Sequence, residues 1–179
     1  MANETSQILF GQLADQVVVV RILGRGNHEL SPTFKRLVDS LNRPDYSPRY
    51  VLDLAECVGL DSTFMGTMAT LALHQMACRK DRVVLVNANA VTRRQMTTLG
   101  LNYLLDLQRE GTSEPIPGRE GLQKVQRAED QTRFDKLVHM IQAHEMLVDV
   151  NSGNEVVFRQ VLDNLHQSLE QEQQDRGRP

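Results

Sequence analysis

The 179 residues of this chain are enough for one domain with an appended segment, and 40% hydrophobic and 24% charged residues are ordinary for a soluble globular protein. A formal net charge of -3, no Trp and an aromatic content of 4% argue against nucleic acid or an anionic membrane surface as a partner. We expect no signal peptide, no membrane span, and two reduced core cysteines, Cys57 and Cys78, in a cytoplasmic protein.

Apolar runs in the first two thirds of the chain predict five strands. The second run, VVVVRIL, is nearly continuous, which is typical of a central strand covered on both faces. Ala14 and Asp15 predict a hairpin turn before it. The predicted strands cover residues 8–10, 17–23, 50–54, 82–86 and 103–107.

Three helices are predicted between these strands. Ser31 as a cap and Pro32 as the first helical residue predict the start of one. A second is expected at 62–80, where the methionines are core residues, and a third follows Asn87 or Asn89 and ends at Gly100. This alternation predicts an α/β fold, a mixed sheet with helices packed on it.

The composition changes after residue 108. The segment REGTSEPIPGREG, at 109–121, predicts a linker, and helical spacing returns beyond it. We expect a domain at 1–125 and a C-terminal helical hairpin with a frayed tail at 126–179, with Asn154 capping its second helix. Each predicted helix of the hairpin carries an apolar stripe. The two stripes should face each other or the domain, and we favour a homodimer through the hairpin. The stripes are Phe134, Leu137, Val138 and Ile141, and Phe158, Val161, Leu162, Leu165 and Leu169.

The joint between the third strand and the second helix carries small polar residues in apolar surroundings. In YVLDLAECVGLDSTFMG, an acid and two hydroxyls, Asp61, Ser62 and Thr63, precede Phe64. One interpretation is a helix cap, which spacing alone favours. The other is a hydroxyl presented to a partner.

The segment VLDLAECVGLDSTFMGTMATL resembles the signature of STAS domains, the fold of bacterial anti-sigma-factor antagonists. The family pattern is a strand ending in Asp, a short loop, Asp-Ser-(Ser/Thr), two apolar positions and a Gly that opens a helix. TTLGLNYLLDL is similar to the family's stretch before the last strand. By element order the resemblance covers about residues 8–125 and implies a four- to five-stranded mixed sheet with helices mainly on one face. The matching positions are Asp53, Asp61, Ser62, Thr63 and Gly66.

The resemblance implies a phosphorylation switch in a partner-switching pathway. In antagonists of this family a partner that is both serine kinase and anti-sigma factor phosphorylates the hydroxyl corresponding to Ser62, and binds only when that hydroxyl is bare. A PP2C-type phosphatase resets the switch. The alternative is a STAS subunit bound constitutively to a transporter ATPase, without phosphorylation. The expected partner-binding residues are Asp61, Ser62, Thr63, Phe64, Thr67, Thr70 and His74.

Two features depart from the family pattern: the bulky Phe64, and the hairpin, which lies outside the common domain. No arrangement of residues predicts catalysis or a cofactor. His139 and His144 are five residues apart, so they do not share a helical face, and we expect no metal site.

Overall fold

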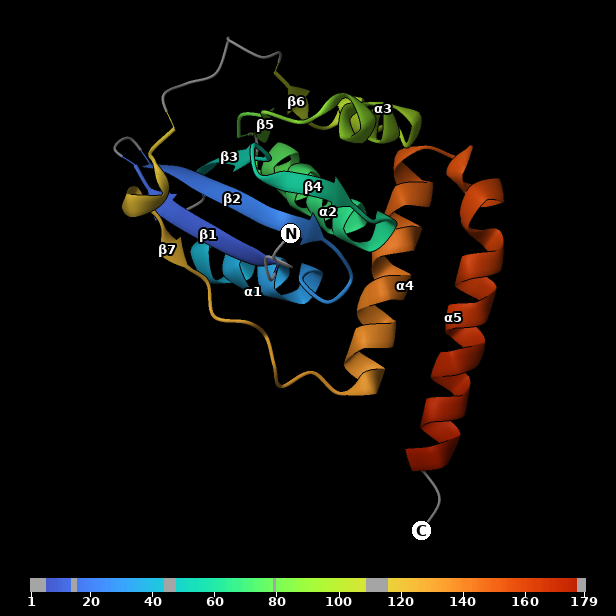
Figure 1. Ribbon diagram of the computed structural model, residues 1–179. Helices are drawn as coiled ribbons and strands as arrows, with labels where there is room; N and C mark the ends of the chain where they lie inside the picture. Colours follow the sequence, from blue (N-terminus) through green and yellow to red (C-terminus); the bar gives the residue numbers. More distant parts are fainter. Residues whose placement is uncertain (1–5, 14–15, 44–47, 79, 109–115, 177–179) are drawn as a thin grey trace.

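The computed structural model describes residues 6–13, 16–43, 48–78, 80–108 and 116–176. Its strands form a mixed sheet in the order β6-β5-β3-β2-β1-β7, with β4 paired to β2 (Figure 1). The strands are β1 (Gln7–Gln12), β2 (Val17–Gly26), β3 (Arg49–Asp53), β4 (Cys57–Leu60), β5 (Val84–Val86), β6 (Asp106–Leu107) and β7 (Gln123–Lys124). The helices are α1 (Ser31–Leu41), α2 (Ser62–Ala77), α3 (Ala90–Thr98), α4 (Arg133–Val150) and α5 (Asn154–Arg176), with short 3-10 turns at Leu101–Tyr103 and Arg119–Gly121.

The predicted mixed α/β fold is confirmed, with a larger sheet than expected. β2 is central as predicted: it pairs antiparallel with β1 and parallel with β3 and β4. β3, β5 and β6 continue in parallel, and β7 adds an antiparallel edge to β1. The predicted turn at Ala14 and Asp15 lies outside the described residues. β4 and β7 were not predicted, because four and two residues are too few to show an alternating pattern.

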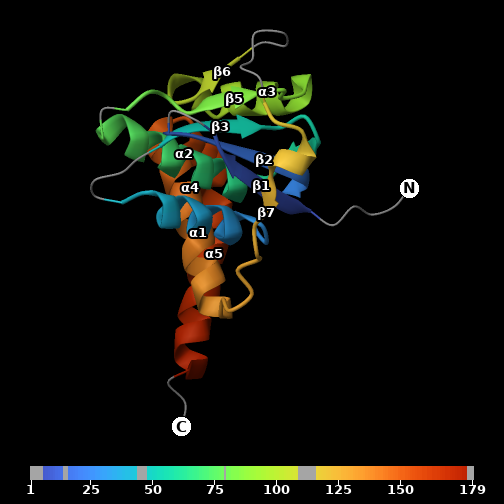
Figure 2. The same ribbon diagram turned by 90° about the vertical axis from the view of Figure 1, so that its left-hand side faces the viewer.

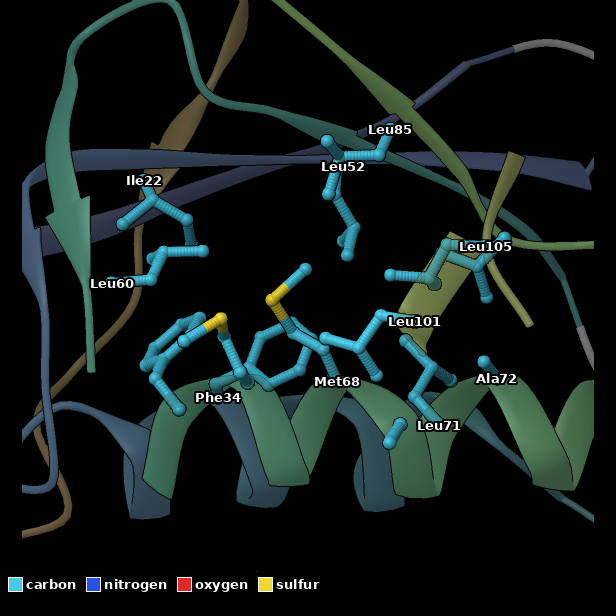
Figure 3. Packing of buried hydrophobic residues seen from close by; sticks show 14 of the residues in the cluster. Ile22, Phe34, Leu52, Leu60, Met68, Leu71, Ala72, Leu85, Leu101 and Leu105 are labelled. Carbon is cyan, nitrogen blue, oxygen red and sulfur yellow. The ribbon is translucent and has the colours of Figure 1, made fainter. Parts of the chain in front are cut away.

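The main core lies between the sheet and helices α1 and α2, which cover the same face (Figures 1 and 2). Aliphatic side chains from β2, β3 and β5 meet Phe34 of α1 and Met68 of α2 (Figure 3). The opposite face carries a smaller valine cluster, with Ile116 and Leu122 packed against it. The prediction of helices mainly on one face is therefore confirmed.

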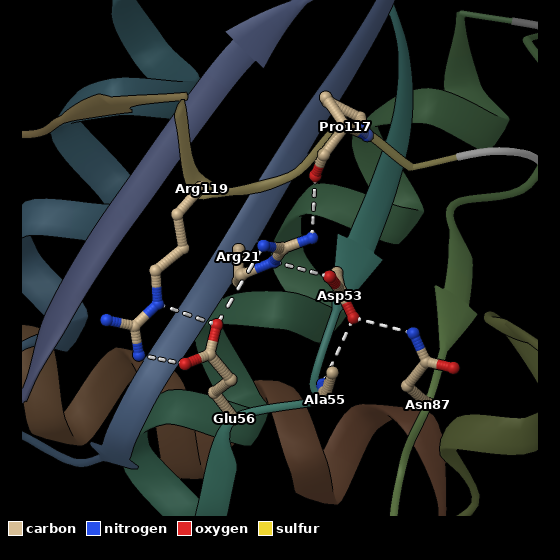
Figure 4. Close-up of polar contacts among 7 residues, drawn as sticks. All are labelled: Arg21, Asp53, Ala55, Glu56, Asn87, Pro117 and Arg119. Carbon is tan, nitrogen blue, oxygen red and sulfur yellow. Dashed lines mark hydrogen bonds and ion pairs between the residues drawn. The ribbon is translucent and has the colours of Figure 1, made fainter. Parts of the chain in front are cut away.

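A buried ion pair lies on that opposite face. Arg21 of β2 donates through Nε to Oδ2 of Asp53 at the end of β3, at 2.6 Å, and both residues are buried. The same guanidinium donates to the carbonyl of Pro117 at 2.9 Å, which ties the segment before β7 to the sheet (Figure 4). The other Asp53 oxygen accepts from the Asn87 side chain at 2.8 Å. Asp53, the last residue of β3, therefore has a structural role.

The two cysteines differ in environment. Cys57 is buried as predicted, and burial raises the pKa of its thiol. The prediction of a core position was wrong for Cys78, which is exposed just after the last residue of α2. Both are free thiols. None of the helices in the described part of the chain combines the length and apolarity that crossing a membrane requires.

The C-terminal helices form an antiparallel pair beside the domain. α4 lies along α2, and α5 packs against α4 (Figures 1 and 2). Asn154 begins α5 and is buried, and its side chain donates to the carbonyls of Leu99 at 3.0 Å and Leu147 at 2.7 Å. Leu147 and Phe158 belong to the main core. The helical pair is thus attached to the domain of its own chain.

Candidate functional site

Asp61 caps helix α2. Its Oδ1 accepts from the backbone N–H of Phe64 at 2.9 Å, and its Oδ2 accepts from the backbone N–H of His28 at 2.7 Å. Ser62 follows as the first residue of the helix. The cap and the hydroxyl are therefore separate residues, and the Ser62 hydroxyl is not needed to start the helix.

The Ser62 hydroxyl contacts a histidine of the C-terminal pair. Ser62 Oγ lies 2.8 Å from Nε2 of His144 on α4, and Nδ1 of the same ring lies 2.7 Å from the carbonyl of Met140. A carbonyl can only accept, so Nδ1 carries the proton. In the neutral ring Nε2 is then an acceptor, and the Ser62 hydroxyl donates to it. His144 is buried and also meets the Phe158 ring of α5 edge-on, with centroids 5.0 Å apart.

A second histidine of α4, five residues earlier, makes a similar contact. His139 Nε2 lies 2.8 Å from Ser31 Oγ and 3.3 Å from Thr67 Oγ1, and these two hydroxyls are 2.6 Å apart. Burial, and secondarily the charge of Lys35, lowers the pKa of His139, so the ring is neutral at neutral pH.

The contact of Ser31 with His139 corrects the prediction for the start of α1. Leu30, which has no side-chain cap bond, stands at the N-cap position, and Ser31 is the first helical residue. The side chain of Asn27 accepts from the Leu30 N–H at 3.1 Å instead. Ser31 is buried, and its hydroxyl binds α4 rather than the helix start.

Gly66 allows α4 to approach α2 closely. A Cβ built on Gly66 would lie 2.1 Å from the carbonyl oxygen of Ala143, far inside van der Waals contact. His139, Ala143 and Leu147, spaced by four along α4, therefore form the stripe that faces the domain. This stripe was missed because a histidine and an alanine do not stand out as apolar in the sequence.

The predicted partner-binding residues divide into three groups by burial. Asp61 and Ser62 are half-buried, and Thr70 and His74 are exposed. Thr63 and Thr67 are buried. The two exposed residues lie on an open groove of about 540 Å³ between α1, α2 and α4.

Phe64 is a correction to the predicted surface. Its side chain is 0% exposed and packs against Phe34, with ring centroids 5.2 Å apart. The ring also lies next to Gly26 of β2. The bulky residue that departs from the family pattern therefore fills the core and adds nothing to the surface.

Within the described residues, no three His, Cys, Asp or Glu side chains lie close enough together to hold a metal ion. His139 and His144 bond hydroxyl groups of α1 and α2 instead. The separations of 108 and 82 residues explain why the sequence did not reveal these pairs.

No known protein-family model matches the chain, and a search of curated proteins finds no relative. Among solved structures, the chain is similar to a protein described as a candidate anti-sigma factor antagonist from Thermotoga maritima, at 20% identity over 54% of this chain and 81% of that one, with a TM-score of 0.49. It is also similar to the unphosphorylated anti-sigma factor antagonist SpoIIAA, at 14% identity over 50% and 81%, with a TM-score of 0.46. An uncharacterized protein with a SpoIIAA-like fold from Shewanella loihica aligns at 15% identity over 62% and 93%, with a TM-score of 0.40. At these identities and scores the likeness concerns the course of the chain and carries no argument about function.

Proposed function

We propose that this chain is a phosphorylation-switched regulatory binding protein, an anti-sigma-factor antagonist. It binds a cytoplasmic serine kinase/anti-sigma factor when Ser62 is bare, releases it when Ser62 carries phosphate, and is reset by a PP2C-type phosphatase. The observation that carries the proposal is the position of Ser62. Its hydroxyl is the first side chain of α2, directly after the Asp61 cap, at the position where the STAS signature places the phosphorylated residue.

The position suits a charge switch. A phosphate adds about -1.5 to -2 charges at neutral pH, and the positive end of the α2 dipole tolerates them. A partner bound along the exposed side of α2, at Thr70 and His74, would meet that charge at one end of its footprint. Binding is then controlled by a local charge without refolding the domain.

Mass spectrometry of the protein purified from its own host tests the proposal. We expect phosphate on the peptide that contains Ser62, lost in Ser62→Ala and retained in Thr63→Ser, which keeps a hydroxyl at the buried neighbour. Phosphate that persists in Ser62→Ala contradicts the assignment. An unmodified Ser62 in a chain that copurifies with a transporter ATPase supports the alternative function.

A further inference from the structure

We propose that α4 and α5 are an inhibitory segment of this chain. α4 covers one side of the N-terminal half of α2, and the two helices must move away before Ser62 can be phosphorylated. The inference rests on the proposed function and adds its regulation: the phosphoacceptor is masked by a helix of the same molecule.

The masking follows from the contacts of Ser62. In phosphorylation the Ser62 oxygen forms a bond to the γ-phosphorus of the kinase's ATP, the bond to ADP breaks, and the hydroxyl proton passes to a base of the kinase. In the folded chain that proton is donated to His144 at 2.8 Å, and the ring is held in place by Met140 and Phe158. Ser62 is half-buried, and α4 covers the side of its oxygen that bonds His144, so a kinase gains full access to the oxygen only when α4 is displaced.

The surface of α2 beneath α4 is suited to reversible contact. It includes two hydroxyl-bearing residues and a glycine, Ser62, Thr67 and Gly66. Hydroxyls released from His139 and His144 can bond water instead, so opening exposes little apolar surface of α2. The apolar cost of opening lies with Leu147 and Phe158, which leave the main core. The large apolar side chains of this helix, such as Phe64 and Met68, point into the domain core and stay there.

The connection to the domain permits the movement. Residues 125–132 run between β7 and α4 without helix or strand, and each is exposed or half-buried. Eight residues can span roughly 26 Å when extended. Hydrogen bonds with the domain hold this segment and must break when it moves. The Arg36 guanidinium donates to the carbonyls of Gln126 at 3.1 Å and Arg127 at 2.8 Å, and the backbone N–H groups of Val125 and Ala128 donate to the Ile8 carbonyl at 2.9 Å and the Thr33 hydroxyl at 3.0 Å. α4 and α5 can thus leave together, still packed on each other.

Thiol labelling of the full chain measures the masking without any kinase. Ser62→Cys is introduced with Cys78→Ser, so that the remaining native thiol is the buried Cys57. Ala143→Arg places a long charged side chain against Gly66 and should expel α4, whereas Gln142→Arg adds the same side chain at an exposed position one residue away. We expect a hydrophilic maleimide to label the thiol introduced at position 62 about tenfold faster or more with Ala143→Arg than with Gln142→Arg, because reactivity follows the open fraction. Equal labelling rates in the two folded variants overturn the proposal.

Hydrogen exchange of the unmodified full chain provides a measurement that does not depend on the variants folding. We expect the amides of α4 and α5 to exchange well before those of β2 and β3, because the helical pair opens as a separate unit. Exchange of α4 together with these strands, in a single global event, overturns the proposal.

Phosphorylation in a lysate of the host separates this inference from the proposed function. Faster phosphate incorporation at Ser62 with Ala143→Arg than with Gln142→Arg supports the masking. Equal incorporation in both overturns the masking but leaves the phosphorylation switch intact. Differential thiol labelling at position 62, with no phosphate incorporation at Ser62 in either variant, supports the masking and contradicts the proposed function.

Discussion

At the scale of single residues, Asp61 and Ser62 have separate roles, one as the helix cap and the other as a hydroxyl bonded to α4. Asp61 accepts two backbone N–H groups, and Ser62 donates to a buried histidine. We expect Asp61→Ala to lower the free energy of unfolding by about 0.5–2 kcal/mol, the usual loss for an N-cap. Ser62→Ala leaves Nε2 of His144 without its donor and should cost about 0.5–1.5 kcal/mol.

Urea melts of Asp61→Ala and Ser62→Ala measure these two losses of stability. Melts of His144→Ala and of Ser62→Ala combined with His144→Ala complete a double-mutant cycle. In such a double-mutant cycle we expect a coupling energy between Ser62 and His144 of at least about 0.5 kcal/mol. A coupling energy of zero would mean that the hydroxyl and the ring do not interact in solution.

His139 predicts how stability depends on pH. Its pKa in the folded chain is lowered by burial, so the unfolded chain binds the proton first as pH falls through about 6.5. The free energy of unfolding should therefore decrease as pH falls below about 6.5, and this loss should stop growing once pH is below the folded pKa. Thermal melts between pH 7.5 and 5.5 should show a smaller decrease for His139→Gln than for the wild type. His166→Gln, at an exposed histidine, is the control, and an unchanged slope in His139→Gln contradicts the expectation.

The roles of these residues were only partly predictable. The acid and the hydroxyl stand together in the sequence, and a cap needs a partner three residues away, so Asp61 and Ser62 could be identified from the local pattern. The roles of His139 and His144 could not be identified in this way, because their hydrogen-bond partners lie on other helices, whose positions depend on the sheet. One sequence signal was present: polar residues at 139 and 144 interrupt an otherwise helical apolar pattern.

At the scale of elements, the fit between α2 and α4 depends on Gly66. Alanine is favoured over glycine within a helix by about 1 kcal/mol, so Gly66→Ala alone should stabilise α2. A Cβ there would come 2.1 Å from the Ala143 carbonyl oxygen, and α4 would have to shift. We expect a net loss of stability, measured by urea melts, together with faster hydrogen exchange in α4.

Gly59→Ala serves as the control for this substitution. A Cβ on Gly59 meets only the end of the Arg25 side chain, at 3.8 Å, within ordinary contact distance. If Gly66→Ala stabilised the protein and left exchange in α4 unchanged, the close approach of the two helices would be wrong.

The predictability of elements follows their length and pattern. β2, α1 and α2 were predicted with correct type because each carries a long apolar pattern. β4 and β7 depend on neighbours: β4 is held by pairing with the end of β2, and β7 by pairing with β1. The apolar stripe predicted on α4 includes Phe134, which lies under the Arg176 guanidinium of α5 at 5.0 Å. The stripe that contacts the domain is a different one, and its small and polar residues explain why it was missed.

At the scale of the whole molecule, the position of the helical pair bears on the expected homodimer. That expectation depended on an apolar stripe without a surface to cover it. In the folded chain α5 packs on α4, Phe158 joins the main core and Leu162 packs against it, so part of that stripe is covered within the same chain. The boundary at residue 125 stays a prediction.

We therefore expect the full chain to be a monomer, with a mass near 20.3 kDa by light scattering at micromolar concentration. Three large apolar residues of α5 are exposed, Val156 at 75%, Val157 at 61% and Val161 at 39%, far fewer than the roughly 20–30 residues that each partner contributes to a stable interface. A particle of twice this mass would contradict the expectation. Val157→Lys would then identify the interface, since a charge at this exposed apolar position should dissociate a dimer built on α5, whereas Gln160→Lys at a neighbouring exposed position should leave it intact. A dimer that survived Val157→Lys would have to use another surface, and the masking of Ser62 by α4 would be unaffected by it.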